Sequence, residues 1–240
     1  MKNRLDRLLV ERGLADSREK AQALIMAGEV MVNGQKASKP GQPVAEDAAL
    51  EVLARPPFVS RGGVKLAAAL RHFAIDTAGK VCMDIGSSTG GFTDALLQAG
   101  ALRVHAVDVG AGQLAWSLRT DSRVRLHEGI NARGLTADEI GEPVDLATCD
   151  VSFISVTLVL PAIVPLLRAE GQMVILIKPQ FEVGKGQVGK GGIVRQPELH
   201  RAACERVTEA VHEFGFQTEM IESPIAGAEG NREFLLYAHH

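Results

Sequence analysis

The chain has 240 residues, 46% of them hydrophobic, and a net charge of −3 at pH 7. This length and composition suit one large or two modest domains with a buried core, and the net charge excludes a protein that is basic over its whole surface. The charge is uneven, because residues 1–40 hold 8 Lys and Arg against 5 Asp and Glu, whereas the remainder holds 18 against 24. We therefore expect a polyanion to dock at the N-terminal part.

Cysteines and apolar runs narrow the class of protein further. Cys82, Cys149 and Cys204 form no CxxC pair, which predicts free thiols in a reducing compartment and no metal site. The stretch MKNRLDRLLVERG has no sustained apolar core, so no signal peptide is predicted. No window reaches the roughly 18 to 20 apolar residues that span a bilayer. We expect a soluble cytoplasmic protein that does not bind membranes. Nothing in the sequence sets its oligomeric state.

The N-terminal residues carry the pattern of a small helical module. Leucines recur on one face over residues 4–12, which predicts a first helix. A second helix is expected after Asp16, which can cap it with Glu19 as reciprocal partner, and it ends at Gly28. The segment EVMVNGQKA predicts a strand, an Asn-Gly turn and a second strand. Residues 1–54 are therefore predicted to form a helix–helix–hairpin module.

The residues RLDRLLVERGLADSREKAQALIMAGEVMVNG fall in an order that resembles the RNA-binding module first named from ribosomal protein S4. The resemblance covers about residues 2–50. It implies that basic side chains of this region bind RNA, and the candidates are Arg4, Arg7, Arg18 and Lys20, with Arg61 beyond the module. By composition alone these arginines fit an ordinary solvated face equally well, but the ordered match favours RNA binding.

Residues 55–61 are predicted to be a linker, because ARPPFVS places two prolines after a strand-like run. From residue 60 to the end, strand and helix patterns alternate, which predicts an α/β domain over 62–240 with a mostly parallel sheet and helices on both faces. The expected strands are Val81–Ile85, Val104–Val109, Val124–His127, Val144–Cys149, Met173–Ile177, Gln217–Glu222 and Glu233–Ala238. The expected helices are Gly63–Phe73, Phe92–Ala99, Ser155–Leu167 and Pro197–Phe214.

Ligands of such sheets bind at the carboxyl ends of the strands. The first strand runs into DIGSSTGGF, whose glycines let the backbone approach a ligand but do not have the dinucleotide spacing GxGxxG. Asp84 would repel a pyrophosphate. Asp108 follows at the end of the second strand, the position at which an acidic residue of such sheets hydrogen-bonds a ribose. S-adenosylmethionine fits this pattern, although a loop kept tight for packing alone remains an alternative. The candidate cofactor-binding residues are Asp84, Gly86, Ser87, Ser88, Thr89, Gly90, Gly91, Phe92, Asp108 and Asn131; for Asn131, a capped loop is almost as good an explanation.

Two further strands end on charged residues, Asp150 and Lys178. If the last strand is antiparallel, Glu233 at its start reaches the same rim, and Lys65 lies on the helix leading into the first strand. Each residue alone could be a solvated strand end or a loop cap. Four charges of alternating sign at one edge favour a reaction site. Asp150 is followed by Val-Ser-Phe and not by two prolines, which disfavours methylation of an amino nitrogen.

These residues resemble the FtsJ-like ribose 2′-O-methyltransferases and their Lys-Asp-Lys-Glu tetrad, which would fall on Lys65, Asp150, Lys178 and Glu233. With the RNA-binding module in front, the whole chain resembles the TlyA family, often labelled haemolysin A, through SRGGVKL, DIGSSTGGFTDALL, AVDVG, DVSFIS, IKPQFE, KGGIVR and GNREF. The resemblance implies a Rossmann-like seven-stranded methyltransferase sheet. It also implies methylation of cytidine 2′-hydroxyls in ribosomal RNA, with the RNA or a ribosomal subunit as partner.

In this interpretation Lys178 contacts the 2′-oxygen, as a base or as a polarising cation, and Asp150 orients it. Lys65 and Glu233 would fix the geometry. Longer members of the family act on both subunits and shorter ones on 23S RNA alone, and the short termini here favour 23S RNA. Two alternatives stay open: an RNA-binding ribosome-assembly factor with an inactive methyltransferase fold, and a membrane-active haemolysin. A nicotinamide-dependent dehydrogenase is disfavoured by the glycine spacing.

Overall fold

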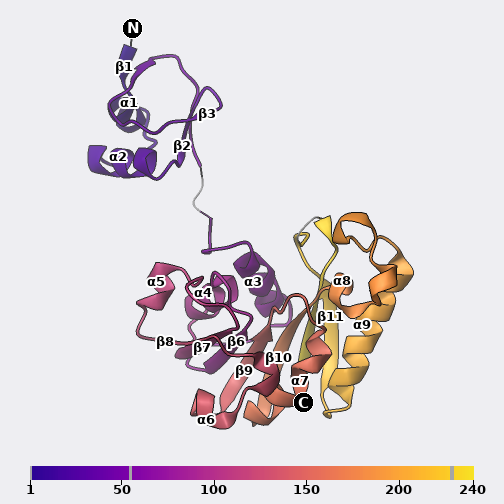
Figure 1. Cartoon of the computed structure of the whole chain (residues 1–240). Coiled ribbons are helices and arrows are strands. Elements are labelled where there is room, and N and C mark those ends of the chain that lie inside the picture. The colour runs from indigo at the N-terminus through magenta and orange to yellow at the C-terminus, as the bar shows by residue number, and fades with distance from the viewer. Residues whose placement is uncertain (1, 54–55, 228–229) are drawn as a thin grey trace. The chain divides into compact units, whose positions relative to one another are not determined.

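The computed structural model describes residues 2–53, 56–227 and 230–240. The chain divides into two compact units, Met1–Pro56 and Pro57–His240, each visible in Figure 1. Ala54, the last residue of the expected module, and Arg55, the first of the expected linker, lie outside the described residues. The residues from Pro57 fold with the second unit, where Gln98 donates a hydrogen bond of 2.9 Å to the Pro57 carbonyl and Asp94 accepts one of 2.8 Å from the Val59 amide.

The first unit is built on two helices and short strands. Its elements are β1 (Lys2–Arg4), α1 (Leu5–Glu11), α2 (Arg18–Met26), β2 (Val30–Val32), β3 (Gln35–Lys36), β4 (Pro43–Ala45) and β5 (Leu50–Val52). Leucines of α1 pack with Ile25 and Val30, which are fully buried. The two helices and the hairpin of β2 and β3 match the pattern expected from the sequence. The sequence pattern did not indicate β1 and β4, which pair with each other, whereas the strand-like run before ARPPFVS corresponds to β5, which adds to β2.

The start of α2 differs from the expected cap. Ser17 is the capping residue, and its hydroxyl accepts a hydrogen bond of 3.2 Å from the Lys20 amide. Asp16 lies one residue too early and pairs instead with the Lys20 ammonium at 2.5 Å. The expectation of an Asp16 cap was therefore wrong. A cap must directly precede the first helical residue, and Ser17 has the extended backbone that this position needs.

The second unit alternates strands and helices. Its strands are β6 (Val81–Ile85), β7 (Arg103–Asp108), β8 (Val124–Glu128), β9 (Val144–Cys149), β10 (Leu167–Ile177), β11 (Gln217–Glu222) and β12 (Phe234–His239). Its α-helices are α3 (Gly62–His72), α4 (Gly91–Gln98), α5 (Trp116–Arg119), α6 (Ala137–Ile140), α7 (Leu160–Ile163), α8 (Pro179–Glu182) and α9 (Pro197–His212). Short 3-10 turns are η1 (Ala132–Gly134), η2 (Val156–Leu158), η3 (Val164–Leu166), η4 (Lys185–Gln187) and η5 (Lys190–Gly192).

In the part of the chain that the structure describes, these strands form one sheet in the order β11-β12-β10-β9-β6-β7-β8. Strands β6 to β10 run parallel, and β12 runs antiparallel to both of its neighbours. The expected α/β fold with a seven-stranded sheet is confirmed. Because β12 is reversed, its first residues lie at the edge where β9 and β10 end, and Glu233 directly precedes β12.

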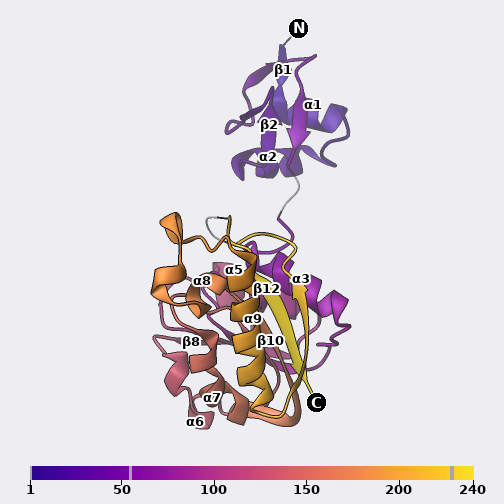
Figure 2. The same ribbon diagram turned by 90° about the vertical axis from the view of Figure 1, so that its right-hand side faces the viewer.

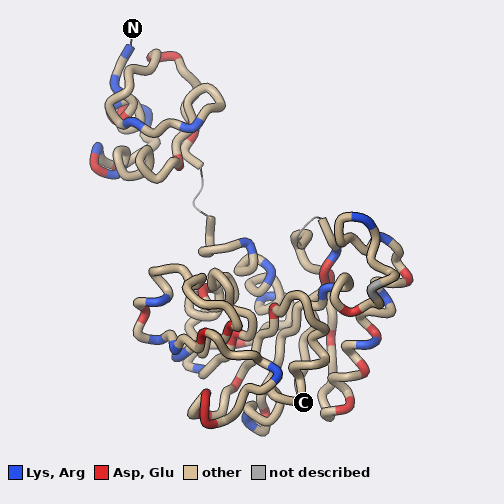
Figure 3. Tube along the Cα trace, in the orientation of Figure 1, with Lys and Arg blue, Asp and Glu red and all other residues tan. Residues whose placement is uncertain are grey.

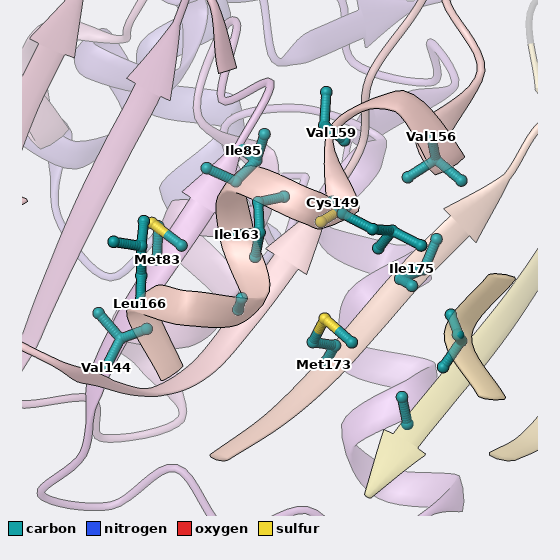
Figure 4. Packing of buried hydrophobic residues seen from close by; sticks show 14 of the residues in the cluster. Met83, Ile85, Val144, Cys149, Val156, Val159, Ile163, Leu166, Met173 and Ile175 are labelled. Atoms are coloured by element: carbon teal, nitrogen blue, oxygen red, sulfur yellow. The ribbon is translucent and has the colours of Figure 1, made fainter. Parts of the chain in front are cut away.

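Helices cover both faces of this sheet. Leucines of α3 and α4 pack on one face with Cys82, Leu146 and Val174. Residues of α7 and α9, among them Ile163 and Val207, pack on the other face. Figure 2 shows α9 lying along β10 and β12, and Figure 4 shows strand residues meeting the residues of the 156–166 segment. Alternate residues of β6 face opposite layers, so Met83 and Ile85 belong to the second layer and Asp84 faces α4.

One expected helix is wrong. The segment Ser155–Leu167 is not continuous, because it divides into η2, the short α7 and η3, and Leu167 already begins β10. Pro161 stands at the start of α7 and Pro165 at the start of η3. A proline lacks the N–H that an inner helical turn needs and its ring crowds the preceding turn. Two prolines four residues apart therefore leave room for only single turns.

Candidate active site at the carboxyl edge of the sheet

Lys178 and Asp150 meet where two neighbouring parallel strands end. Ile175 of β10 is in register with Cys149 of β9, so Lys178 extends beyond the last paired residues. Its ammonium lies 2.6 Å from the Asp150 carboxylate and donates a hydrogen bond of 2.8 Å to the Ser152 hydroxyl. The Lys178 side chain is only 11% exposed. A mostly buried lysine that is bound to a carboxylate and a hydroxyl is fixed in orientation.

A second ion pair lies at the same edge. The Lys65 ammonium of α3 donates to the Glu233 carboxylate at 2.5 Å, and both side chains are buried. Gly227 lies directly against this carboxylate, since a Cβ there would come within 1.9 Å of Glu233 Oε1. Lys65, Asp150, Lys178 and Glu233 line one cavity of about 430 Å³. The structure thus brings the four sequence-predicted residues together as two ion pairs facing one space.

This cavity is one of three that share Asp150. The first, of about 540 Å³, extends from Gly86 along the ends of β7 and β8, and the second, of about 240 Å³, lies between the glycine loop and α3. The third is the cavity of the two ion pairs. Lys65 lines both the second and the third. A ligand that extends through the first two cavities therefore meets a ligand of the third cavity beside Asp150.

The first cavity has the features expected of a nucleoside site. The Asp108 carboxylate accepts hydrogen bonds of 2.7 Å from the amides of Ser88 and Gly110, and it lines the cavity. Asn131 also lines it, while its side-chain oxygen accepts a hydrogen bond from the Arg133 amide and so caps η1. The two interpretations of Asn131 made from the sequence are therefore compatible. Val109, on the same cavity wall, is 73% exposed and supplies apolar surface.

The second cavity is lined by the glycine loop. Ser87, Ser88, Thr89, Gly91 and Phe92 contribute to its wall, together with Arg61 and Lys65. The Ser87 hydroxyl is buried and has no hydrogen-bond partner among the described residues. Gly86 has φ +83°, and a Cβ there would lie 2.6 Å from the Asp150 carbonyl oxygen, so only glycine fits. Gly90 adopts φ +98° but lines neither cavity.

Asp84 does not reach a cavity. Its carboxyl is fully buried, where it accepts hydrogen bonds from Thr93 at 2.7 Å and from Thr148 at 3.3 Å. Burial raises the pKa of Asp84 to about 7, with a further upward contribution from the charge of Asp150. The sequence placed Asp84 among the candidate cofactor-binding residues. In the structure Asp84 instead joins β6 to α4 and β9 through Thr93 and Thr148, because the period of the strand turns it towards α4.

The third cavity is flanked by two phenylalanines that the sequence did not single out. Phe153 has φ +68°, is 88% exposed and lines the first and third cavities. Its ring centroid lies 5.4 Å from that of Phe181. The signal that could have indicated Phe153 is its position three residues after a strand-end aspartate. Sequence alone does not reveal a strained backbone that turns an aromatic ring to solvent.

The candidate RNA-binding residues of the first unit are partly held by carboxylates. Arg4 and Arg18 both pair with the buried Asp6, at 2.8 and 3.0 Å, and both remain about half exposed. The hydrogen bond from Arg4 holds the pKa of Asp6 far below its usual range. Arg7 is exposed, and Lys20 pairs with Asp16. Figure 3 shows Lys and Arg in this unit and along several segments of the second unit, where Arg61 lines the second cavity.

The described residues provide no metal cluster and no long apolar helix. Among them no group of three or more His, Cys, Asp and Glu could hold a metal ion. No helix in the same ranges is long and apolar enough to cross a membrane.

Comparison with known proteins places the chain in a family. The model of the FtsJ-like methyltransferase family matches residues 58–240, and that of the S4 domain matches residues 3–50. The chain belongs to the FtsJ-like methyltransferase family. Within that family it is 49% identical over 237 residues to the 16S/23S rRNA (cytidine-2′-O)-methyltransferase TlyA of Mycobacterium tuberculosis, a match that covers 98% of this chain and 88% of the relative.

Two more relatives extend this FtsJ-like group. The putative rRNA methyltransferase YqxC of Bacillus subtilis is 48% identical, over 99% of this chain and 86% of that protein. A solved structure described as a putative hemolysin from Streptococcus thermophilus is 43% identical and superimposes with a TM-score of 0.75, over 99% of this chain and 88% of the other. The resemblance to the TlyA family found in the sequence is confirmed, because the matches at 48–49% identity span nearly the whole chain.

Proposed function

We propose that the protein transfers a methyl group from S-adenosylmethionine to the ribose 2′-hydroxyl of a cytidine in ribosomal RNA. Membership of the FtsJ-like family and the S4 domain support a methyltransferase that acts on RNA. The observation that carries the proposal is that Asp150 lines three cavities at once. An adenosine group, a methionine tail and a target ribose can each take one of them, and all three then meet beside the same carboxylate.

The residues present fit S-adenosylmethionine. Asp108 offers free lone pairs to the ribose hydroxyls, and Ser87 offers an unpaired hydroxyl to the polar tail. Gly86 keeps the loop close to the strands because it has no side chain. When bound, S-adenosylmethionine supplies a methyl group on a sulfonium that a nucleophile can attack in line.

The nucleophile needs help from the protein, because a ribose hydroxyl must lose its proton as it attacks. As the base, Lys178 gives one proton to the Asp150 carboxylate, 2.6 Å away, and its freed lone pair takes the proton of the 2′-hydroxyl as the oxygen attacks. Ser152 accepts another N–H of Lys178 and so fixes the nitrogen in place. The two carboxylates of the site neutralise the two ammonium groups, so the cavity can hold a negatively charged RNA strand or a deprotonating hydroxyl without a large net charge. Lys65 and Glu233 fix the wall that faces the donor's tail.

Base recognition has two candidate contributors in the third cavity. Phe153 and Phe181 provide aromatic surface on which a base can stack. The side-chain oxygen of Gln180 is buried and has no hydrogen-bond partner among the described residues, and Gln180 lines the same cavity. An unpaired acceptor suits the exocyclic amine of cytosine. In the first unit, Arg4, Arg7, Arg18 and Lys20 are proposed to hold the RNA backbone, and Arg61 to contact it near the second cavity.

Lys178→Ala is the direct test. We expect it to abolish methyl transfer to ribosomal RNA in a tritiated-methyl assay, while calorimetry still detects S-adenosylmethionine binding. Lys80→Ala serves as the matched control, because Lys80 precedes β6 at the opposite edge of the sheet and should leave the rate unchanged. Full activity of Lys178→Ala would refute the assigned role. RNA binding by the unsubstituted protein without any methyl transfer would favour the assembly-factor alternative.

Mass spectrometry of the RNA decides the product. Incubation of naked RNA, of each subunit and of whole ribosomes should yield a cytidine carrying a 2′-O-methyl group in at least one of them. A methyl group found on a base would contradict the proposed chemistry.

A further inference from the structure

Glu182 has no part in the mechanism given above, although it is a buried carboxylate close to the site. It is the last residue of α8 and stands four residues after Lys178. Only 4% of the residue is exposed. Burial raises the pKa of its carboxyl, and the hydrogen bonds from Ser155 and Val156 oppose that rise. Burying such a group is costly unless its partners compensate.

The partners of Glu182 lie in the segment that follows Asp150. Its carboxylate accepts a hydrogen bond of 2.8 Å from the Val156 amide and one of 2.5 Å from the Ser155 hydroxyl. The bond to Val156 joins a side chain of α8 directly to the backbone of this segment. The segment has no regular structure between Asp150 and Ser155, so Glu182 holds its far end.

These contacts close a ring through the site. The chain runs from Asp150 through Ser152 to Ser155, crosses by hydrogen bond to Glu182, returns along α8 to Lys178, and crosses back to Asp150 by the ion pair. Lys178 also donates to Ser152, in the middle of the segment. Arg206 of α9 donates a hydrogen bond of 2.9 Å to the Glu182 carbonyl and fixes α8 from behind.

Phe153 lies inside this ring, with a backbone conformation that costs free energy for a residue with a side chain. Such a conformation persists only where its surroundings hold it. The ends of the segment are held by β9 on one side and by Glu182 on the other. Release of the Glu182 end would let Phe153 relax, and Ser152 would move with it.

We propose that Glu182 is a positioning residue, whose carboxylate joins the segment after Asp150 to the helix after Lys178. It thereby keeps Asp150, Lys178 and Phe153 in their relative positions. This inference rests on the proposed methyl transfer. Glu182 touches neither the donor nor the ribose, and it acts through Asp150, Ser152 and Lys178.

Three substitutions test the role. Glu182→Ala removes both hydrogen bonds, and we expect the single-turnover methylation rate at saturating RNA and donor to fall about 100-fold, the effect of a misplacement of about 1 Å. Donor affinity should fall by a smaller factor than the rate, because Glu182 lines neither cofactor cavity and the segment it holds forms only one wall of the first cavity. Glu182→Gln keeps the length and one acceptor and should recover most of the rate, whereas the shorter Glu182→Asp should not.

Ser155→Ala provides a second line of evidence that leaves the buried carboxylate in place. It should slow methylation less than Glu182→Ala, and the double substitution should be no slower than Glu182→Ala alone, because both changes break the same contact. Glu142→Ala is the matched control: Glu142 is a partly buried carboxylate bound to Arg103 and His105 just before β9, at the other edge of the sheet. It should lower thermal stability and leave the rate of the folded protein unchanged.

Hydrogen–deuterium exchange separates this inference from the proposed function. Exchange in residues 150–157 should rise in Glu182→Ala and stay at the wild-type level in Glu142→Ala. Unchanged exchange, or a rate in Glu182→Ala that falls only in proportion to the unfolded fraction, would overturn the positioning role. Absence of methyl transfer by the unsubstituted protein would refute the proposed function instead, and the exchange result would still decide whether Glu182 holds the segment.

Discussion

Replacement of Gly227 by alanine perturbs the Lys65–Glu233 pair by adding one methyl group. A Cβ at Gly227 would lie 1.9 Å from Glu233 Oε1 and 2.4 Å from its carboxyl carbon, whereas real Cβ contacts essentially never fall below 3.0 Å. The carboxylate must therefore retreat by about 1 Å or more, or the chain at Gly227 must shift. Glu233 is 2% exposed and has little space to retreat without losing Lys65.

The size of the effect follows from this displacement. A misplacement of about 1 Å in a catalytic arrangement costs about 100-fold in rate, which corresponds to about 2.7 kcal/mol of barrier height. We therefore expect Gly227→Ala to lower the single-turnover rate of methyl transfer about 100-fold. Folding should become less stable by about 1–3 kcal/mol, the usual cost of overpacking.

The assay is transfer of tritiated methyl to ribosomal RNA at saturating donor, with thermal unfolding measured in parallel. Gly134→Ala is the matched control, because a Cβ there meets nothing within 4 Å and its φ is not in the left-handed region. A wild-type rate in Gly227→Ala would refute the reasoning, since it would mean that the Lys65–Glu233 contact is not required or that the added methyl group is absorbed elsewhere.

Two further predictions concern the carboxylates around the glycine loop. Asp108→Ala should weaken donor binding about 10- to 100-fold in calorimetry, because a hydrogen bond to a charged group contributes about 1.5–3 kcal/mol. Asp138→Ala, which changes an exposed residue of α6, is the control and should leave donor binding unchanged. Equal affinities of Asp108→Ala and the unsubstituted protein would contradict the ribose role. The pKa of Asp84 is raised to about 7, so this carboxyl stabilises the fold fully below its unfolded value near 3.8 and loses that contribution as the pH rises through 7. Asp84→Asn cannot ionise and should flatten the fall in melting temperature between about pH 4 and pH 7; identical pH profiles would contradict the assigned burial.

The sequence predicted the parts of the fold that depend on periodicity. The expected strands agree with the observed ones to within a residue or two at most ends, because strands buried on both faces appear in the sequence as continuous apolar runs. The exceptions have local causes. The start of β10 was missed because Leu167–Gly171 is not apolar, and the helix before it was drawn through Pro161 and Pro165, which break it.

The candidate site was predictable as far as strand order could place its residues. The ends of β9 and β10 and the start of the reversed β12 had to lie at one edge, so Asp150, Lys178 and Glu233 could be named in advance. The orientation of a side chain within a strand was harder, as Asp84 demonstrates. Contacts between distant loops were beyond reach, because nothing in the sequence relates Glu182 to Ser155 or Gly227 to Glu233 before the chain is folded.

The shared wall at Asp150 has a consequence for inhibition. A compound that fills only the first cavity binds where any nucleoside-binding fold offers an acidic ribose contact, so selectivity is hard to achieve there. A single molecule that joins an adenosine group to a cytidine-like group past Asp150 would occupy the first and third cavities together. Once the adenosine group is bound, the cytidine-like group would bind at high effective concentration. The compound would also contact two ion pairs and an aromatic wall that a compound confined to the first cavity does not reach.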